Sequence, residues 1–214
     1  AWLDTRTERN ERELRNLVRN ARNQSNIERV IVGNETILRG DFKPAELARI
    51  LHKVREQVRQ PVSTAEPWHV WIRYPELARE VDFIAAHILP YWEGVPADQA
   101  LKFTVERYDQ LRKAFPDKPT LSAEAGWPSH GNRREQAVAS QVNQARFLRR
   151  FLNTADTRGM DYFIMEAFDQ PWKRGIEGTV GAYWGLLDAD RNPKFAMSGP
   201  VVENSWWPAQ AAFA

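Results

Sequence analysis

The sequence predicts an α/β protein built on parallel strands, and the form it favours is a (β/α)8 TIM-type barrel. Segments with the apolar and β-branched character of buried strands alternate with segments whose apolar residues recur at helical spacing along the 214 residues. Aromatic and acidic residues fall where the strands end, which is the edge where parallel barrels carry their sites. A doubly wound sheet usually has a glycine-rich phosphate turn, and the sequence contains none.

Composition narrows the functional class. Hydrophobic residues make up 43% of the chain and charged residues 27%, which is typical of an ordinary globular domain. The 30 basic and 28 acidic residues nearly cancel, so we expect no nucleic-acid partner. The chain has no cysteine, so its stability rests on the core without disulfides.

Periodicity assigns the elements in order. We expect five strands, near residues 30–34, 61–65, 82–88, 120–123 and 162–168. Between and before them the helical segments are Arg6–Arg22, Pro44–Gln60, Tyr74–Glu80, Ala97–Phe115 and Arg134–Leu152. The second strand leads into a predicted loop that holds Trp68, His69 and Trp71.

Two glutamates end strand-like phrases. Glu35 follows the run Val30–Asn34, and Glu124 follows Thr120–Ala123. A carboxylate at the end of a buried parallel strand lies at the edge of the sheet where active sites are found. Glycoside hydrolases use a pair of carboxyl groups for catalysis. The alternative is that each glutamate caps a helix or pairs with an arginine, but the surrounding phrases favour catalysis.

Tryptophan is unusually frequent, with nine in the chain. Several tryptophans come next to strand ends, where an exposed aromatic face can stack on a sugar ring, although core packing is the alternative for any one of them. These are Trp68, Trp71, Trp92, Trp127 and Trp172.

The four histidines, His52, His69, His87 and His130, lack the spacing of a zinc site. We therefore expect no metal and no cofactor. His69 lies in the aromatic loop and is expected to contact sugar, whereas His52 lies on a helix and is expected to be structural. No nucleophile-elbow phrase of a serine hydrolase occurs.

Three motifs resemble those of family 17 glycoside hydrolases, which are (β/α)8 barrels active on β-1,3-glucan. They are Val32-Gly33-Asn34-Glu35, the run Ala123–Ser129 and the run Tyr162–Lys173. Shorter phrases at 62–68 and 183–186 also resemble the family. The resemblance runs from about residue 1 to 198. It favours the bacterial branch, whose members include periplasmic transglucosylase modules of glucan-synthesis systems.

The resemblance implies specific roles. Glu35 would be the general acid/base, Glu124 the nucleophile, and Asn34 the partner of the 2-hydroxyl of the reacting sugar, with Tyr91 beside the nucleophile. Plant members have a glutamate where Gln170 stands, so a charge-based role at that position is not expected here. The other residues expected to bind substrate are Glu66, Trp68, His69, Trp71, Trp92, Trp127, Phe168, Asp169, Gln170, Trp172, Lys173 and Glu177.

Counting strands back from Glu35 leaves the predicted barrel incomplete. Glu35 would end the fourth strand, so the first two strands and most of the third, roughly 70–90 residues, would precede the sequence given. We expect residues 1–198 to be the catalytic barrel, incomplete at its N-terminus, and 199–214 to be a C-terminal tail.

The leading functional hypothesis is a retaining β-1,3-glucan transglucosylase with a covalent glucosyl-enzyme, because Trp68, Trp71 and Trp92 offer a platform for an acceptor sugar. One alternative is an endo-β-1,3-glucanase, with water as acceptor. The other is a non-catalytic glucan-binding module of a larger synthase. The resemblance further implies β-1,3-glucan oligosaccharides as partners, a periplasmic location, and a place in a larger membrane-associated glucan-synthesis protein.

Overall fold

The computed structural model describes residues 1–201, so positions 202–214 of the expected tail lie outside the described residues. The chain forms two compact units, and each is described by itself. The first unit comprises residues 1–88, 106–124 and 160–163, and the second comprises residues 89–105, 125–159 and 164 onward.

The chain forms a five-stranded sheet with the strands in chain order, β1-β2-β3-β4-β5, and all of its residues except Ala125 and Ile164 belong to the first unit. The strands are β1 (Val30–Asn34), β2 (Val62–Pro67), β3 (Ile84–His87), β4 (Thr120–Ala125) and β5 (Asp161–Ile164). Pairs β1–β2, β2–β3 and β3–β4 are parallel, so the predicted parallel α/β arrangement is confirmed.

The last strand is shorter than predicted. It ends at Ile164, whereas the apolar run suggested a strand to residue 168. After Ile164, the Glu166 amide donates to the carbonyl of Trp184, and Phe168 forms an isolated bridge with Leu187. Backbone pairing with this later segment replaces continuation of β5.

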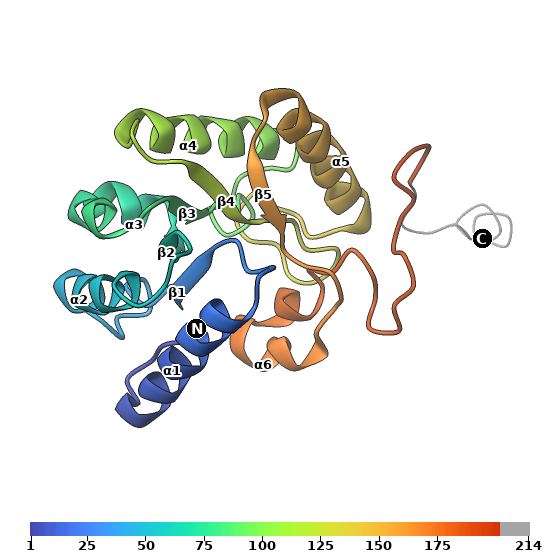
Figure 1. The fold of residues 1–214 in the computed structure, drawn as a ribbon. Coiled ribbons are helices and arrows are strands. Elements are labelled where there is room, and N and C mark those ends of the chain that lie inside the picture. Colours follow the sequence, from blue (N-terminus) through green and yellow to red (C-terminus); the bar gives the residue numbers. More distant parts are fainter. Residues whose placement is uncertain (202–214) are drawn as a thin grey trace, which may run out of the picture. The chain divides into compact units, whose positions relative to one another are not determined.

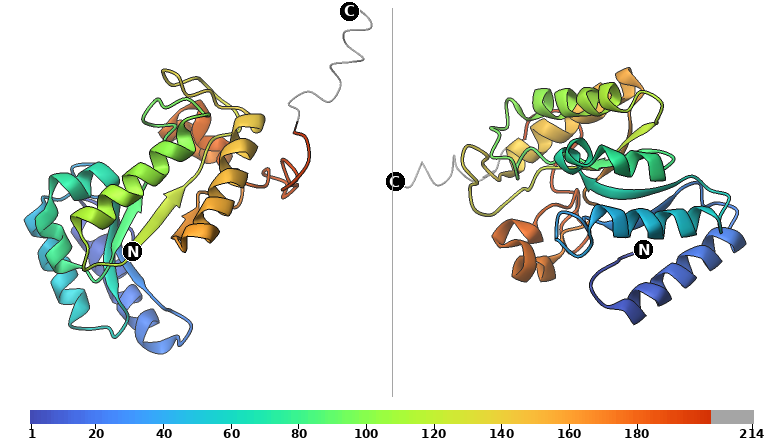
Figure 2. Two further views of the ribbon diagram at one scale, coloured as in Figure 1. Left: turned by 90° about the horizontal axis from the view of Figure 1, so that it is seen from above. Right: turned by 90° about the vertical axis from the view of Figure 1, so that its left-hand side faces the viewer.

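Three helices cover the same side of β1–β3 (Figures 1 and 2): α1 (Thr7–Asn23), α2 (Pro44–Arg55) and α3 (Trp68–Arg73). The right-hand view of Figure 2 shows α3, α2 and α1 next to one another in that order. Pro44 begins α2 as predicted, although the helix ends at Arg55, short of the expected Gln60. A 3-10 helix at Pro75–Glu80 occupies most of the segment predicted as helical near Tyr74–Glu80.

The segment predicted as an aromatic loop is the helix α3. Trp71 is fully buried, and its indole N–H donates to the Ala85 carbonyl at 2.9 Å. Its ring also meets that of Phe115 edge to face, with centroids 6.5 Å apart. Insertion of this side chain into the core orders the segment as a helix, which local sequence alone did not indicate.

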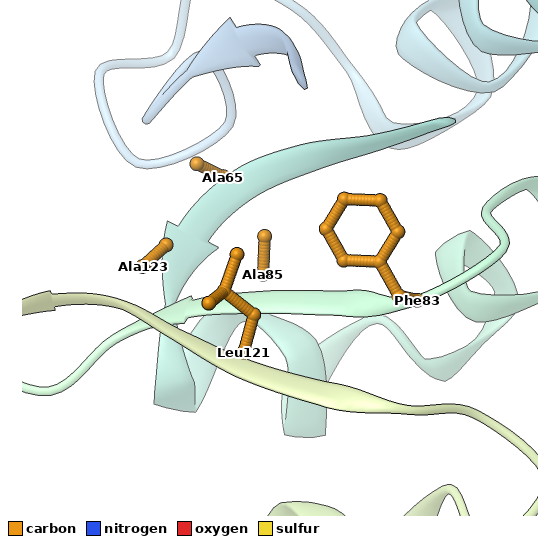
Figure 3. Packing of buried hydrophobic residues seen from close by; sticks show 5 residues of the cluster. All are labelled: Ala65, Phe83, Ala85, Leu121 and Ala123. Atoms are coloured by element: carbon orange, nitrogen blue, oxygen red, sulfur yellow. The ribbon is translucent and has the colours of Figure 1, made fainter. Parts of the chain in front are cut away.

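One face of β2, β3 and β4 carries a small apolar cluster of buried side chains (Figure 3). Phe83 and Leu121 are its large members, and three alanines complete it: Ala65, Ala85 and Ala123. Ile31 of β1 packs against the same cluster. The polar residues described below come from the ends of these same strands.

Helix α4 (Ala100–Ala114) has residues in both units, and α5 (Gln141–Arg158) belongs to the second. The predicted start of α5 at Arg134 is wrong. Ser140 is its N-cap, with Oγ accepting from the Asn143 amide at 3.1 Å, and residues 134–137 form a short bridge before it. The second unit also has the short helices η2 (Pro171–Lys173), α6 (Arg174–Glu177) and η3 (Thr179–Ala182).

Within the described part of the chain, the helices lack the length and apolar character needed to span a membrane.

Candidate active site

Glu35 lies in the turn directly after β1. Its backbone adopts φ 54°, in the left-handed region that is uncommon for a residue with a side chain, and Gly33 two residues earlier has φ 84°. The Glu35 amide donates to the Ala65 carbonyl of β2 at 2.7 Å. This bond to the neighbouring strand stabilises the strained turn, so the carboxylate is presented from a fixed backbone.

Glu66 of β2 binds the same turn through its carboxylate. Its carboxylate accepts hydrogen bonds from the Ile37 amide at 2.8 Å, the Leu38 amide at 3.2 Å and the Thr36 hydroxyl at 3.1 Å. The residue is fully buried, so it has no surface to present to a sugar, in contrast to the substrate contact expected of it. Its position makes it a support for Glu35.

His87, the last residue of β3, lies between the two glutamates of the predicted catalytic pair. Its Nδ1 is 2.8 Å from Glu35 Oε1, and its Nε2 is 3.5 Å from Glu124 Oε1. The backbone register explains this position, because His87 pairs with Pro67 on one side and with Glu124 on the other. The Glu124 carbonyl also accepts from the Ile88 amide at 3.0 Å.

Burial differs sharply within this trio. The His87 side chain is 3% exposed, whereas those of Glu35 and Glu124 are 27% and 26% exposed. The two carboxylates are therefore accessible to solvent, whereas the imidazole is buried. Within the described residues, no hydrogen-bond partner is found for the buried Nε2 of His87.

The electrostatics of the cluster follow from burial and carboxylates. Burial disfavours the imidazolium, but the hydrogen bond with Glu35 and the charges of Glu124, Glu35 and Glu66 outweigh it, so the pKa of His87 is raised. Burial also raises the pKa of Glu66, against the opposing effect of its three hydrogen bonds. The folded protein thus holds a proton on His87 and on Glu66 more tightly than the free side chains would.

One carboxylate oxygen of Glu35, one of Glu124 and one His87 nitrogen lie within 4.8 Å of one another. Two carboxylates this close can serve as a nucleophile and a proton donor on the same bond. Two carboxylates and an imidazole are also donor types that a divalent cation uses. The hydrogen bond between His87 and Glu35 accounts for the arrangement without an ion.

The aromatic residues of the first unit divide into exposed and buried members. Trp68 is partly exposed, His69 is exposed, and their rings meet edge to face at 5.7 Å. The Arg107 guanidinium lies 4.8 Å from the centre of the Trp68 ring. Trp71 is buried in the core, so of these three only Trp68 and His69 present surface to a ligand.

In the second unit, Tyr91, Trp92 and Trp127 belong to one aromatic group. The Tyr91 ring lies 5.3 Å from that of Trp92 and 5.8 Å from that of Trp127, both edge to face. Trp127 is fully buried and Tyr91 is 2% exposed, with its hydroxyl donating to the Asn132 carbonyl at 2.5 Å. Trp92 is partly exposed and remains the member able to stack on a sugar.

A polar group in the second unit is built on Glu166. Its carboxylate accepts hydrogen bonds from the Lys173 ammonium at 2.7 Å and from the side-chain amide of Gln170. Gln170 and Lys173 therefore share one partner, Glu166, which is not among the predicted site residues.

Asp169 has a different partner. Its carboxylate accepts from the Lys194 ammonium at 2.8 Å and from the Gly185 amide at 2.9 Å, and its side chain is 8% exposed. This buried pair holds the segment around residue 185, which leaves little of Asp169 for the substrate contact expected of it.

Among the predicted substrate-binding residues of the second unit, Phe168 is 43% exposed and Trp172 is 64% exposed. Glu177, in α6, is partly exposed. Asn34, in the first unit, is also partly exposed, and its carbonyl accepts from the Arg39 guanidinium.

Two functional candidates were missed from the sequence. His87 was treated as one of four scattered histidines, although its place at the end of a strand, like that of Glu35 and Glu124, was a usable signal. Glu166 lies within the third motif and likewise follows a strand. In both cases, position at a strand end was the available evidence.

The fold and this site can be compared with known proteins. A model for the BtgE/BtgC glycoside hydrolase domain matches residues 1–185. A probable glucan endo-1,3-beta-glucosidase btgC of Aspergillus clavatus is 29% identical over 93% of this chain. A putative glucan endo-1,3-beta-glucosidase btgC of Aspergillus niger is 31% identical over 90% of it. The chain spans 32% of the length of each of these two relatives.

Among solved structures, the family 17 β-1,3-glucanosyltransferase of Rhizomucor miehei superposes with a TM-score of 0.82 at 33% identity. The match covers 92% of this chain and 74% of that one. An active-site mutant of the same enzyme, in complex with laminaritriose, matches equally well. These relatives are fungal, whereas the sequence motifs favoured the bacterial branch.

Proposed function

Because the chain belongs to the BtgE/BtgC glycoside hydrolase domain family, we propose that it is a retaining β-1,3-glucan transglucosylase acting on laminari-oligosaccharides. The observation that carries the proposal is the approach of Glu35 and Glu124, with oxygens of the two carboxylates within 4.8 Å. Retaining glycosidases place their carboxyl groups about 5–5.5 Å apart, whereas inverting enzymes separate them by about 6.5–9.5 Å to admit a water.

The reaction would proceed in two steps. In the first, a Glu124 oxygen attacks the anomeric carbon while Glu35 gives its proton to the departing glycosidic oxygen, which leaves a glucosyl ester on Glu124. In the second, Glu35 takes the proton of an incoming sugar hydroxyl, whose oxygen displaces Glu124. Each step moves one proton through Glu35, so the enzyme returns to its starting state.

The substrate class follows from the relatives. The Rhizomucor miehei enzyme is a β-1,3-glucanosyltransferase whose mutant was solved with laminaritriose, and it is 33% identical to this chain. Partly exposed Trp68 and Trp92 supply aromatic surface for sugar faces. These observations support laminari-oligosaccharides as donors and acceptors.

The roles of the two glutamates can be tested by chemical rescue. In Glu35→Ala, an activated aryl β-glucoside donor still forms the ester, and added azide should release a β-glucosyl azide. In Glu124→Ala, azide should replace the nucleophile and give the α-anomer. Without azide, we expect loss of the acid/base to lower the rate on laminari-oligosaccharides by about 10²–10⁴-fold. The exposed Glu76 provides a matched control, and Glu76→Gln should leave turnover unchanged. The opposite anomers would reverse the assignment.

Hydrolysis is the second candidate, because the Aspergillus relatives are named as glucan endo-1,3-beta-glucosidases. A reduced laminari-oligosaccharide separates the two reactions. Products longer than the donor indicate transfer, whereas exclusively shorter products would establish an endo-glucanase. Laminarin binding without any turnover by the unmodified protein would instead establish a non-catalytic binding module.

We also infer that β1–β5 are part of a (β/α)8 barrel, with β1 and β4 as its fourth and seventh strands. The parallel order of the strands, with two strands between β1 and β4, supports this inference. A periplasmic location and a place in a larger membrane-associated glucan-synthesis protein are further proposals. They rest on the resemblance to bacterial transglucosylase modules, and fractionation of the source cells would test them.

A further inference from the structure

His87 occupies a position that the two-carboxylate mechanism does not use. It lies behind the proposed acid/base and nucleophile, contacts both, and is 3% exposed. A buried imidazole against one carboxylate is common as an ion pair. Here, one nitrogen faces each of the two proposed catalytic groups, at 2.8 Å from Glu35 and 3.5 Å from Glu124.

We propose that His87 is a positioning residue that shares one proton with Glu35 and orients the nucleophile Glu124. The inference rests on the proposed roles of the two glutamates. His87 itself is too deeply buried to meet a sugar, so it acts through its neighbours.

The surroundings of His87 favour a proton on the imidazole. The charged groups that act on it are carboxylates from three elements: Glu35 in the turn after β1, Glu66 on β2 and Glu124 on β4. Burial opposes the charged ring, yet the net effect of these groups is a raised pKa. An imidazolium would place an N–H toward each of Glu35 and Glu124, including the Nε2 for which no hydrogen-bond partner is found in residues 1–201.

Proton sharing follows from the short Nδ1–Oε1 contact. With one proton on the trio, it rests either on His87, with both glutamates ionised, or on Glu35, with the imidazole neutral, and the net charge is −1 in both cases. Transfer along the 2.8 Å hydrogen bond interconverts these forms. The second form is competent, because the acid is protonated and the nucleophile is ionised. His87 therefore serves as a store for the proton that Glu35 donates and later recovers.

This arrangement predicts which way each limb of the pH profile moves when His87 is replaced. In the unmodified protein, His87 keeps the shared proton available above the pH at which Glu35 alone would lose it. Replacement of His87 should therefore move the basic limb of the kcat/KM profile to lower pH. The imidazolium of His87 also stabilises ionised Glu124. Replacement of His87 should therefore move the acidic limb of the profile to higher pH. We expect the basic limb to move by about one pH unit, which is the interaction above which two groups titrate as a coupled pair. The profile should narrow from both sides.

The experiment compares His87→Asn, His87→Gln and His52→Asn with the unmodified protein. The asparagine amide can replace the Nδ1 contact and the glutamine amide reaches toward the Nε2 position, but neither side chain titrates. His52 is the matched control, because it also lies near two carboxylates, at 3.6 Å from Glu56 and 3.8 Å from Glu80, but is 62% exposed. Narrowing in both His87 variants with an unchanged His52→Asn profile supports the proposal.

Other outcomes overturn it. If kcat/KM of the His87 variants falls at every pH while both limbs stay at their original pH, His87 has a purely structural role. Movement of both limbs to higher pH would show that the ring acts only as a fixed positive charge. If both variants fail to fold, the titration of His87 is measured instead in the unmodified protein and in Glu35→Gln.

Imidazole ¹⁵N NMR then reports the titration directly, independent of turnover. We expect His87 to titrate above the usual histidine range, and Glu35→Gln to move that titration to lower pH. An ordinary His87 titration, unaffected by Glu35→Gln, overturns proton sharing. If His87 and Glu35 titrate as a coupled pair but the protein never turns over laminari-oligosaccharides, the proposed function is refuted, whereas proton sharing between His87 and Glu35 stands.

Discussion

At the scale of single residues, Asp169 and Lys194 form a pair that is almost removed from solvent. The carboxylate is 8% exposed and the ammonium is 10% exposed, with 2.8 Å between Oδ1 and Nζ. Lys194 also donates to Ser129 Oγ at 2.7 Å. Burial lowers the pKa of Lys194, and Asp169 is the main group that opposes this effect. The buried ammonium of Lys194 therefore depends on Asp169 as its counter-charge.

Asp169→Ala should be strongly destabilising, because it leaves the buried ammonium without its counter-charge. Removing one partner of a buried pair costs about 3–5 kcal/mol. Urea unfolding followed by fluorescence would measure this change in the free energy of unfolding. The matched control is Asp190→Ala at an exposed carboxylate, where the change should stay within about 0.5 kcal/mol. Equal effects of the two substitutions would show that the Asp169–Lys194 pair contributes no more than an exposed aspartate.

The two glutamates could be predicted from sequence because each closes a strand within a few residues. His87 acquires its role through pairing with Pro67 and Glu124, which are distant in sequence. Tryptophans show the same limit. Trp71 and Trp172 gave the same local signal, yet one is fully buried and the other is 64% exposed, because packing by residues far along the chain decides burial.

At the scale of elements, the turn after β1 depends on backbone conformations that most residues avoid. Gly33 and Gly40 both have positive φ, at 84° and 74°, but their surroundings differ. A Cβ on Gly33 would lie 3.0 Å from Thr36 Cγ2, whereas a Cβ on Gly40 would meet nothing within 4 Å. This contrast provides a pair of matched substitutions.

Gly40→Ala should destabilise by about 1–2 kcal/mol, which is the cost of the left-handed conformation alone. Gly33→Ala should cost more, because the crowding against Thr36 is added to the same backbone strain. It should also lower turnover, since Glu35 follows two residues later. Urea midpoints and kcat on laminari-oligosaccharides would measure both effects. Indistinguishable variants would mean that the turn relaxes without displacing Glu35.

Element boundaries were harder to predict than the elements themselves. Five strands and most helices could be assigned from apolar periodicity, because burial of one face imposes that period. The start of α5 was wrong because the cap is Ser140, six residues after the predicted start at Arg134, and its partner is a backbone amide without a sequence signature. The end of β5 was wrong because pairing with residues near 184–187 competes with strand extension.

At the scale of the whole molecule, the alternation of strands and helices predicted the parallel sheet, because a parallel connection requires a crossover segment. The division into two compact units was not predicted. Helix α4 and strands β4 and β5 each have residues in both units, so no linker or composition change marks the boundary. It depends on long-range contacts that periodicity does not encode.

Stability of the whole protein should depend on pH through His87. Its pKa is raised above the unfolded value of about 6.5, because the hydrogen bond with Glu35 and the nearby carboxylates outweigh burial. A group with a raised folded pKa stabilises the native state fully below the unfolded pKa, and this contribution is lost as pH rises through the folded value. Melting temperature should therefore fall as pH rises above about 6.5.

His87→Asn should flatten that part of the stability curve, whereas His52→Asn should leave its slope unchanged. Differential scanning calorimetry between pH 6 and the alkaline range would measure both variants in the same buffers. A slope that survives His87→Asn would assign the dependence to other groups.

The support that Glu66 gives to the turn around Glu35 has a consequence for how such sequences diverge. Two of its three donors are backbone amides, at positions 37 and 38, and any residue except proline supplies them. The side chains of Ile37 and Leu38 can therefore drift freely as far as this contact is concerned. The acceptor has no such substitute, so selection would act on position 66, one strand away from the turn that it preserves.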